Sequence, residues 1–308
     1  MPVRITSLVA LLAVAAAPFV FGADIPPSDE ARFAEAQKLA DGLHFKQGEI
    51  TLRNGLAKIN VPAEFRYLDP ADAETVLTKI WHNPPTDERS LGMIFPANAG
   101  PLDPEGWGVI LSYEEDGYVK DDDAAKINYD DLLKQMKKGT SDANKVREQK
   151  GYPPVELVGW AAPPRYDQAE HKLYWAKELR FGDDPDPTLN YDIRMLGRRG
   201  VLVLNAVATM DQLSAIQNAT PTILSMVNFQ EGHRYADFNA STDKVATYGL
   251  AALVAGGLLA KGGFFKMLIA GIIAGKKFII VGVIALLAVG KKIYSRITSG
   301  KHAGREHA

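Results

Sequence analysis

The sequence predicts an α+β fold, an antiparallel sheet with packed helices, joined to a C-terminal transmembrane helical segment. Two strand-like stretches of alternating apolar residues and a third, nearly continuous apolar stretch lie between residues 171 and 207, separated by short turns. Helix-like stretches with one apolar face flank them, as layered folds require. A long apolar run then begins at Val245. We therefore expect a signal peptide (1–23), an exported α+β domain (24–244) and a membrane anchor with a basic C-terminal tail (245–308).

The amino terminus has the parts of a secretory signal peptide. Arg4 is its one charge, an apolar run extends from Leu8 to Phe21, and the small residues Gly22 and Ala23 follow. The run is shorter than the roughly 20 residues that a membrane span needs. We expect cleavage after Gly22 or Ala23, and the alternative is an uncleaved amino-terminal anchor.

The expected domain begins with a helix and a β-hairpin. Ser28 is a suitable cap for a helix that extends to Asp41 and ends at Gly42. Alternating apolar residues then flank Asn54-Gly55, a pair typical of type I′ turns, whose central residues both take positive φ. This pattern predicts a hairpin over residues 50–61.

Two further helices and a strand are expected before the main strands. Asp69 should cap a helix that begins with Pro70, because proline is favoured at the first helical position. Residues 107–113 alternate as a strand. Asn128 then opens a polar helix that extends towards Gln149.

The three strands at 171–181, 189–195 and 201–207 follow one another with tight connections. Consecutive strands joined by short turns run antiparallel, so they predict a meander rather than a parallel βαβ design. Asp211 should cap the next helix, whose apolar stripe we expect to cover the meander. Pro221 should kink or divide that helix.

Charge separates the two ends of the mature chain. Residues 245–308 hold nine Lys/Arg and one acid (Glu306), a net charge of +8. Residues 24–244 hold 36 acids and 25 Lys/Arg, a net charge of −11. A basic membrane segment on an acidic exported body follows the positive-inside tendency, which predicts a bacterial inner-membrane protein with its body on the periplasmic or extracellular side.

The number of membrane crossings is open. Lys276 and Lys277 do not fit the bilayer midplane, so we divide the segment there and expect a first span over Thr247–Phe265. The second run, Phe278–Gly290, would rise only about 20 Å as a helix against a hydrocarbon core of roughly 30 Å. It is either an interfacial helix or half of a hairpin. In both cases the lipid bilayer is the expected partner of residues 245–290.

Small residues recur at four-residue spacing in the first span, at Ala252, Gly256 and Ala260. Small residues on one helix face let two backbones approach in lipid, which would make the chain a homo-oligomer. The alternative is that alanine and glycine are simply abundant in this segment.

Several classes of chemistry are excluded or not indicated. The chain has no cysteine, which excludes disulfides, thiolate nucleophiles and iron–sulfur clusters. None of the six histidines lies at metal-ligand spacing with another, and no nucleophile elbow, Walker loop or dinucleotide fingerprint occurs. We therefore assign no catalytic, metal or cofactor-binding residue, and expect neither a cofactor nor a nucleic-acid partner.

Two acidic clusters are candidate cation sites. Residues 114–116 and 121–123 flank Tyr118, and Asp183, Asp184 and Asp186 occupy the turn of a later hairpin. Neither has the spacing of a calcium loop, and aspartate is common in solvated turns, so we favour solvated turns. The four tryptophans fit core positions better than sugar-binding platforms.

The string from Gly232 to Asn239 is the most distinctive in the domain. His233, Arg234, Tyr235 and Asp237 form the candidate ligand or juxtamembrane interaction site. They would bind a ligand or a polar headgroup, or alternatively satisfy one another and fix the chain as it enters the membrane. We favour the second interpretation.

This string, continuing through Ser241 to Ala252, resembles a bacterial family of uncharacterised membrane-anchored proteins, the domain of unknown function two-one-six-seven. The strings Trp81-His82-Asn83-Pro84-Pro85 and Tyr174-Trp175-Ala176 are similar to that family too, and the likeness covers nearly all of the mature chain. It implies an exported domain tethered by a carboxyl-terminal membrane segment and supplies no catalytic residues. The fold is similar to a PsbP-like α/β/α sandwich, an analogy that implies no function.

The sequence is compatible with three functions. The first is a non-enzymatic, membrane-anchored periplasmic domain that binds an envelope protein or another envelope component. The second is an envelope hydrolase that uses acids of the exported domain, with Glu114 or Asp116 beside His171. The third is a transport or assembly subunit whose helical tail is the active part.

Overall fold

The computed structural model describes residues 29–81, 90–103, 106–149 and 153–255. The expected signal peptide (1–23) lies outside these residues, as does all of the expected anchor after Ala255. Within the described ranges, no helix combines the length and the apolar character that a membrane crossing requires.

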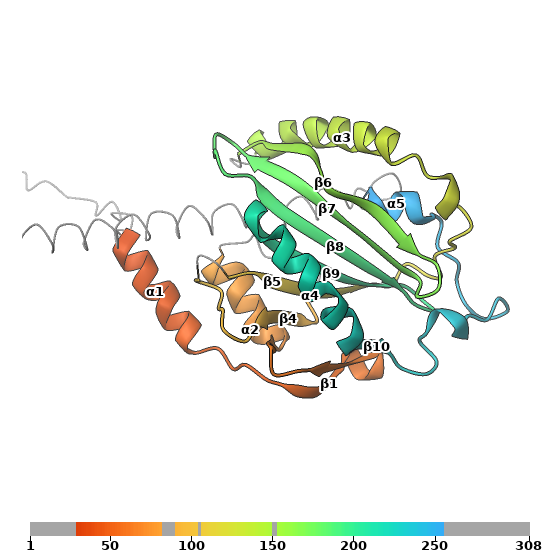
Figure 1. The fold of residues 1–308 in the computed structure, drawn as a ribbon, viewed down its shortest axis with the longest axis horizontal. Helices are drawn as coiled ribbons and strands as arrows, with labels where there is room; N and C mark the ends of the chain where they lie inside the picture. Colours follow the sequence, from red (N-terminus) through yellow and green to blue (C-terminus); the bar gives the residue numbers. More distant parts are fainter. Residues whose placement is uncertain (1–28, 82–89, 104–105, 150–152, 256–308) are drawn as a thin grey trace, which may run out of the picture.

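A seven-stranded antiparallel sheet organises the domain (Figure 1), with the strand order β3-β4-β5-β9-β8-β7-β6. The strands are β3 (Phe65–Leu68), β4 (Gly92–Pro96), β5 (Gly108–Glu114), β6 (Val155–Asp167), β7 (Lys172–Phe181), β8 (Thr188–Leu196) and β9 (Val201–Thr209). Every neighbouring pair is antiparallel. The predicted meander is thus confirmed as β7-β8-β9, and the α+β class with it.

The predicted hairpin is confirmed, but its turn is not type I′. The second sheet contains β1 (Gly48–Leu52), β2 (Ala57–Val61) and β10 (Val227–Phe229), in the order β1-β2-β10. Leu52 pairs with Ala57, so the connection has four residues instead of two. Arg53, Asn54 and Gly55 all have positive φ, of 37°, 53° and 90°. Three left-handed residues in a row make a wider loop than the two that a type I′ turn contains.

The described helices lie where the sequence places them, with α5 inside the stretch expected to start the anchor. They are α1 (Asp29–Asp41), α2 (Pro70–Glu74), which continues as a π-helical turn over Thr75–Ile80, α3 (Tyr129–Gln149), α4 (Leu213–Met226) and α5 (Leu250–Val254). Asp69 caps α2 as predicted, because its carboxylate accepts hydrogen bonds from the backbone N–H groups of Ala71 and Asp72. Asn128 accepts from two backbone N–H groups at the start of α3 in the same way.

The predicted cap of α4 is wrong by two residues. A 3-10 turn over Met210–Gln212 leads into α4, and Thr209, not Asp211, caps that turn; the Gln212 side chain accepts from the Thr209 backbone N–H at 3.0 Å, as in a capping box. Asp211 instead lies in the first turn. Pro221 lies inside a helix that continues to Met226, so the helix is not divided.

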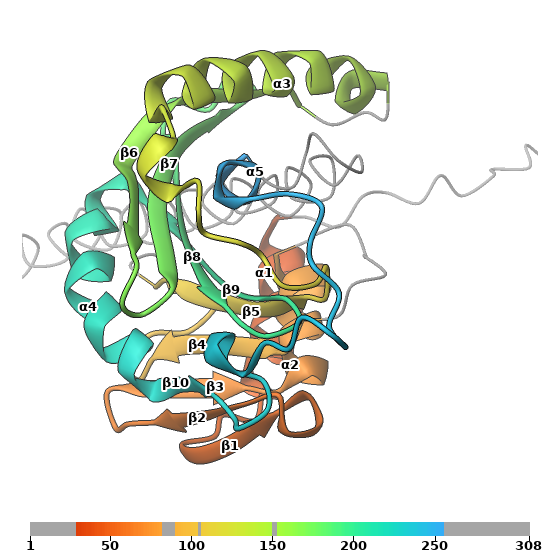
Figure 2. The same cartoon turned by 90° about the vertical axis from the view of Figure 1, so that its right-hand side faces the viewer.

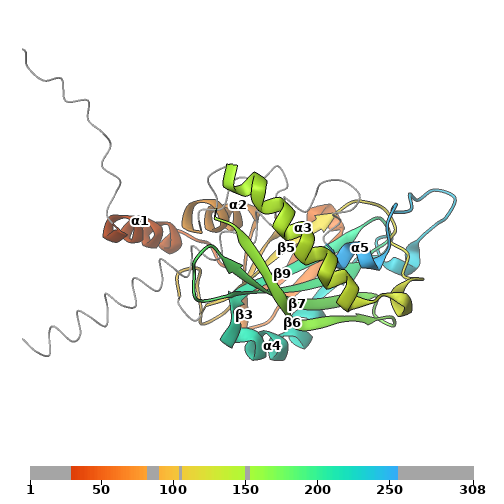
Figure 3. The same cartoon turned by 90° about the horizontal axis from the view of Figure 1, so that it is seen from above.

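The large sheet is covered on both faces. On its convex face, α4 and the small sheet close one apolar core, to which Ile216, Ile223 and Ile59 belong. Figure 2 shows α5 inside the curve of the sheet and α4 outside it. On the concave face, α3 and α5 close a second core, and α1 and α2 close a third over β4. In Figure 3, α3 crosses the end of the sheet formed by β6 and β7, while α1 lies beside α2. The concave face is therefore the one that the last described residues enter.

The described domain continues beyond the expected boundary at residue 244. Leu250, Leu253 and Val254 are buried in the concave core with α3, β6 and β7. The described part of the expected first span, residues 247–255, is thus packed against the sheet.

Candidate functional site

The chain between Gly232 and Ala255, which we call the connecting segment, runs from the end of β10 into the concave face. It passes the turn between β8 and β9 and then pairs with the loop after β5. A parallel bridge joins Tyr118 to Val245: the Tyr118 N–H donates to Lys244 at 2.8 Å, and the Ala246 N–H donates to Tyr118 at 2.8 Å. The segment that precedes the expected anchor is therefore hydrogen-bonded to the domain.

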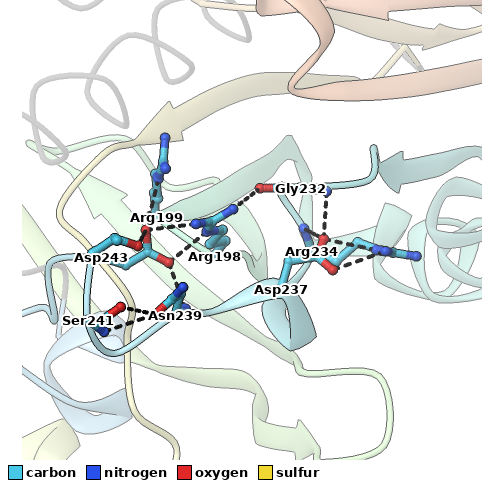
Figure 4. A network of polar contacts seen from close by, with 9 residues as sticks. Arg198, Arg199, Gly232, Arg234, Asp237, Asn239, Ser241 and Asp243 are labelled. Atoms are coloured by element: carbon cyan, nitrogen blue, oxygen red, sulfur yellow. Dashed lines mark hydrogen bonds and ion pairs between the residues drawn. The ribbon is translucent and has the colours of Figure 1, made fainter.

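Asp243 is the centre of the first group of contacts (Figure 4). Its side chain is fully buried and faces Arg198, whose Nε lies 2.6 Å from Oδ2 and whose Nη2 lies 3.1 Å from Oδ1. Arg199 adds a contact of 3.3 Å, and the backbone N–H of Asn239 donates at 2.8 Å. The hydrogen bond from Arg198 is the main reason that the pKa of Asp243 lies well below its ordinary value.

The four predicted site residues separate into two groups. Arg234 and Asp237 pair with each other, at 3.0 Å for both guanidinium contacts, and Asp237 also accepts from the Gly232 and Arg234 backbone N–H groups (Figure 4). Mainly because of the Arg234 hydrogen bond, the pKa of Asp237 is lowered to about 2. His233 contributes its backbone carbonyl, which accepts from the Arg198 N–H at 2.9 Å.

Tyr235 points away from this group to a second one around Asp121. Its hydroxyl donates to the Val119 carbonyl at 3.0 Å and to Asp121 Oδ1 at 3.1 Å. Tyr166 donates to Asp121 Oδ2 at 2.6 Å, and His171 Nδ1 lies 3.3 Å from the same oxygen. Asp121 therefore joins the hairpin between β6 and β7 to the connecting segment.

Aromatic rings stack beside this carboxylate. Tyr118 lies between Tyr235 and Phe238, with centroid distances of 4.4 and 3.9 Å, and His171 lies 4.0 Å from Tyr235. Such stacked pairs add to the free energy of burial itself. His171 also has a φ of 50°, the left-handed region that a residue with a side chain rarely adopts.

The pKa values in this group follow from its geometry. Burial raises the pKa of Asp121, but hydrogen bonds from Tyr166, Tyr235 and His171 outweigh it, and the net direction is down. Burial, reinforced by the carboxylate, raises the pKa of Tyr166 and of Tyr235. Asp121 is thus a stable acceptor for two tyrosine hydroxyls that stay protonated.

Other acids of the 114–123 region also contact the connecting segment, contrary to the solvated turn favoured from the sequence. Asp116 accepts from the Tyr248 hydroxyl at 2.7 Å, and Asp123 accepts from the Leu250 N–H at 3.3 Å. Gly117 shows how close this contact is: its φ is 109°, and a Cβ there would lie 2.7 Å from the Lys244 carbonyl oxygen. The acids therefore fasten one part of the chain to another.

The hydrolase hypothesis paired His171 with Glu114 or Asp116. Of the acids after β5, the one that the structure places at His171 is Asp121, whereas Asp116 contacts Tyr248. Arg198 and Arg199, which hold Asp243, were not found from the sequence. The sequence does place both arginines between Gly197 and Gly200, in the turn after β8. Side chains in a turn lie outside the sheet, where another part of the chain can contact them.

The fold and the site define a class: an α+β domain whose carboxyl-terminal segment is fastened to its own sheet. The particular family follows from the sequence. The family model described as "Protein of unknown function (DUF2167)" matches residues 44–287, and the chain belongs to this family. The resemblance inferred from the sequence is thereby confirmed. No curated protein matches the chain.

Solved structures with remote similarity include two named proteins. The solution structure of cyanobacterial PsbP from Synechocystis sp. PCC 6803 is 12% identical, with 59% of this chain and 91% of that chain covered and a TM-score of 0.33. The Saccharomyces cerevisiae Ran-binding protein Mog1p is 10% identical, with 64% and 100% covered and a TM-score of 0.33. Similarity at this level carries no argument, so the PsbP-like arrangement stays a prediction.

Proposed function

We propose that this protein is a membrane-anchored accessory protein of the bacterial cell envelope, whose exported domain binds a partner protein or envelope component without catalysing a reaction. The basic segment 256–308, which follows the part of the chain packed against the sheet, would hold it in the inner membrane, with the acidic domain on the outer side. The observation that carries the proposal is the fastening of the connecting segment by Asp243 and Asp121.

The physical argument concerns orientation. A soluble domain on a flexible linker samples many positions above a membrane, whereas a domain bonded to the chain that leads into the anchor keeps one orientation. Arg198 and Arg199 hold Asp243 from the turn after β8, and Asp121 holds Tyr235 at the hairpin between β6 and β7. Fixed height and orientation favour recognition of another component held in the same envelope.

Location is tested by adding protease to spheroplasts. We expect digestion of the domain while a cytoplasmic marker survives, and retention of the polypeptide in membranes during an alkaline carbonate wash. A protected domain, or release by carbonate, would contradict the anchor. Chemical crosslinking in the same membranes should join the domain to a defined envelope component. Turnover of a model ester, peptide or glycan with no crosslinked component would favour the hydrolase instead.

Fastening is tested with trypsin, because Lys244 is exposed and lies next to the bridge between Tyr118 and Val245. Asp243→Asn weakens the contacts to Arg198 and Arg199, so cleavage after Lys244 should become several-fold faster. Asp186→Asn, in the exposed turn between β7 and β8, is the matched control and should leave the rate unchanged. Equal rates in wild type and Asp243→Asn would remove the argument from orientation.

A further inference from the structure

The end of the connecting segment covers the concave face of the large sheet as a short strap, which we define as residues 248–255. Its side chains Leu250, Leu253 and Val254 are at most 2% exposed and belong to the core that α3 also closes. They are positions i, i+3 and i+4 of α5, so the buried residues form one face of this helix. Figure 2 shows the helix inside the curve of the sheet. The strap is therefore part of the cover of the concave face.

Two polar contacts join the strap to the loop after β5. The Tyr248 hydroxyl donates to Asp116 at 2.7 Å, and the Leu250 N–H donates to Asp123 at 3.3 Å. The preceding part of the connecting segment is held separately, by Asp243 and by the bridge at Val245. Opening of the strap therefore leaves these earlier attachments intact.

Gly249 lets the strap approach the domain closely. A Cβ at this position would lie 2.6 Å from Asp123 Oδ2, which is shorter than an ordinary van der Waals contact. A side chain here would displace the carboxylate that accepts from the Leu250 N–H. Closure of the strap in this position therefore depends on glycine at residue 249.

The face that the strap covers contains buried charges as well as apolar residues. Lys177, Asp192 and Arg194 are only 8, 1 and 2% exposed. Burial is the main cause of the raised pKa of Tyr248, to which the nearby charges of Glu114 and Arg194 contribute with opposite signs, so the strap begins beside this charged group. Buried charges have lost hydration, which opening would return to them. This gain offsets part of the apolar burial that opening loses.

We propose that the strap is a displaceable cover: residues 248–255 open as a unit while the rest of the domain stays folded, and opening exposes the concave face. A short helix with few polar attachments belongs to the least stable part of a domain, where local opening needs much less free energy than global unfolding. The opened strap would lie in an apolar environment, since residues 245–260 carry no charge. The device is independent of which component the domain binds.

Single cysteines test the opening, because the chain has none of its own. Val203→Cys places a thiol on the concave face, opposite Arg194 in register, and Ala206→Cys places one on the convex face of the same strand. The two positions are similarly buried, at 6 and 4% exposure. In the full chain in detergent, a water-soluble maleimide should label Val203→Cys at least about tenfold faster than Ala206→Cys, whose thiol reacts only on global unfolding. Equal labelling rates would overturn the proposal.

Gly249→Ala makes the test specific to the strap. It should accelerate labelling of Val203→Cys about fivefold, the effect of losing roughly one hydrogen bond, and leave the rate of Ala206→Cys unchanged. Tyr248→Phe, which loses only the hydroxyl contact to Asp116, should act in the same direction. The matched control is Gly159→Ala in β6, where a Cβ meets nothing within 4 Å, and it should alter neither rate.

Two results with these variants would contradict the strap. If Gly249→Ala and Tyr248→Phe leave the labelling of Val203→Cys unchanged, another element controls access to the concave face. If they accelerate the labelling of both thiols equally, they destabilise the whole domain, and the strap does not open by itself.

Discussion

On its convex side, β8 presents only apolar and aromatic side chains to α4 and the small sheet, whereas on its concave side it presents an amide, a carboxylate and a guanidinium. The convex residues are Leu189, Tyr191, Ile193 and Met195, and the concave ones are Asn190, Asp192 and Arg194. Both sets are buried, so the difference is not one of solvent exposure. The convex face is stabilised by the hydrophobic effect, and the concave face depends on contacts between buried charges.

The largest effect should come from Asp192→Ala. Asp192 Oδ2 lies 3.1 Å from Lys177 Nζ, and Oδ1 lies 3.2 Å from Arg194 Nη1. The substitution removes the carboxylate that both buried cations face, which should cost about 3–5 kcal/mol of unfolding free energy. Denaturant titration measures it.

Replacing all three charged residues of the concave side at once separates the effect of charge from the effect of packing. Lys177→Met, Asp192→Leu and Arg194→Met together should restore most of the stability that Asp192→Ala loses, since a buried ion group is often replaceable by apolar residues of similar volume. A triple variant as unstable as Asp192→Ala would show that packing, not charge, explains the single substitution.

On the convex face, Leu189→Ala should cost about 3 kcal/mol, through lost burial and the cavity that remains. Leu189 is completely buried between the sheet and α4. The same titration measures it. A loss from Leu189→Ala well above that from Asp192→Ala would contradict the ranking of the two faces.

The elements with a clear period were predictable from the sequence. The hairpin and the first two strands of the meander alternate regularly, the third strand is a nearly continuous apolar run, and the caps at Asp69 and Asn128 have standard chemistry. β6 was missed because Gly159 and Pro163-Pro164 interrupt its pattern, and its pairing with β7 shifts register three times. β4 was missed because Met93, Ile94 and Phe95 are buried on both faces and so do not alternate.

The site was less predictable, since it depends on contacts between distant parts of the chain. Tyr235 and Asp121 are 114 residues apart, and nothing local to either indicates the other. The polar side of β8 alternates as it would in a strand that faces solvent, so the burial of its polar residues could not be predicted from the sequence. Residues 250–254 show a related ambiguity, because burial in a core and burial in lipid select the same apolar residues.

The smallest effect should come from the connecting segment, where Arg234 and Asp237 are partly exposed and therefore screened. The pKa of Asp237 is lowered to about 2, below the roughly 3.9 of an unfolded aspartate, so its stabilisation is complete above pH 4 and is lost as the pH falls towards 2. Asp237→Asn should therefore lower the Tm by about 2 °C at pH 6, while the difference from the wild type disappears near pH 2. Calorimetry across this range measures the convergence. A constant difference at every pH would mean that the carboxylate acts through its backbone hydrogen bonds, which asparagine partly keeps, and not through its charge.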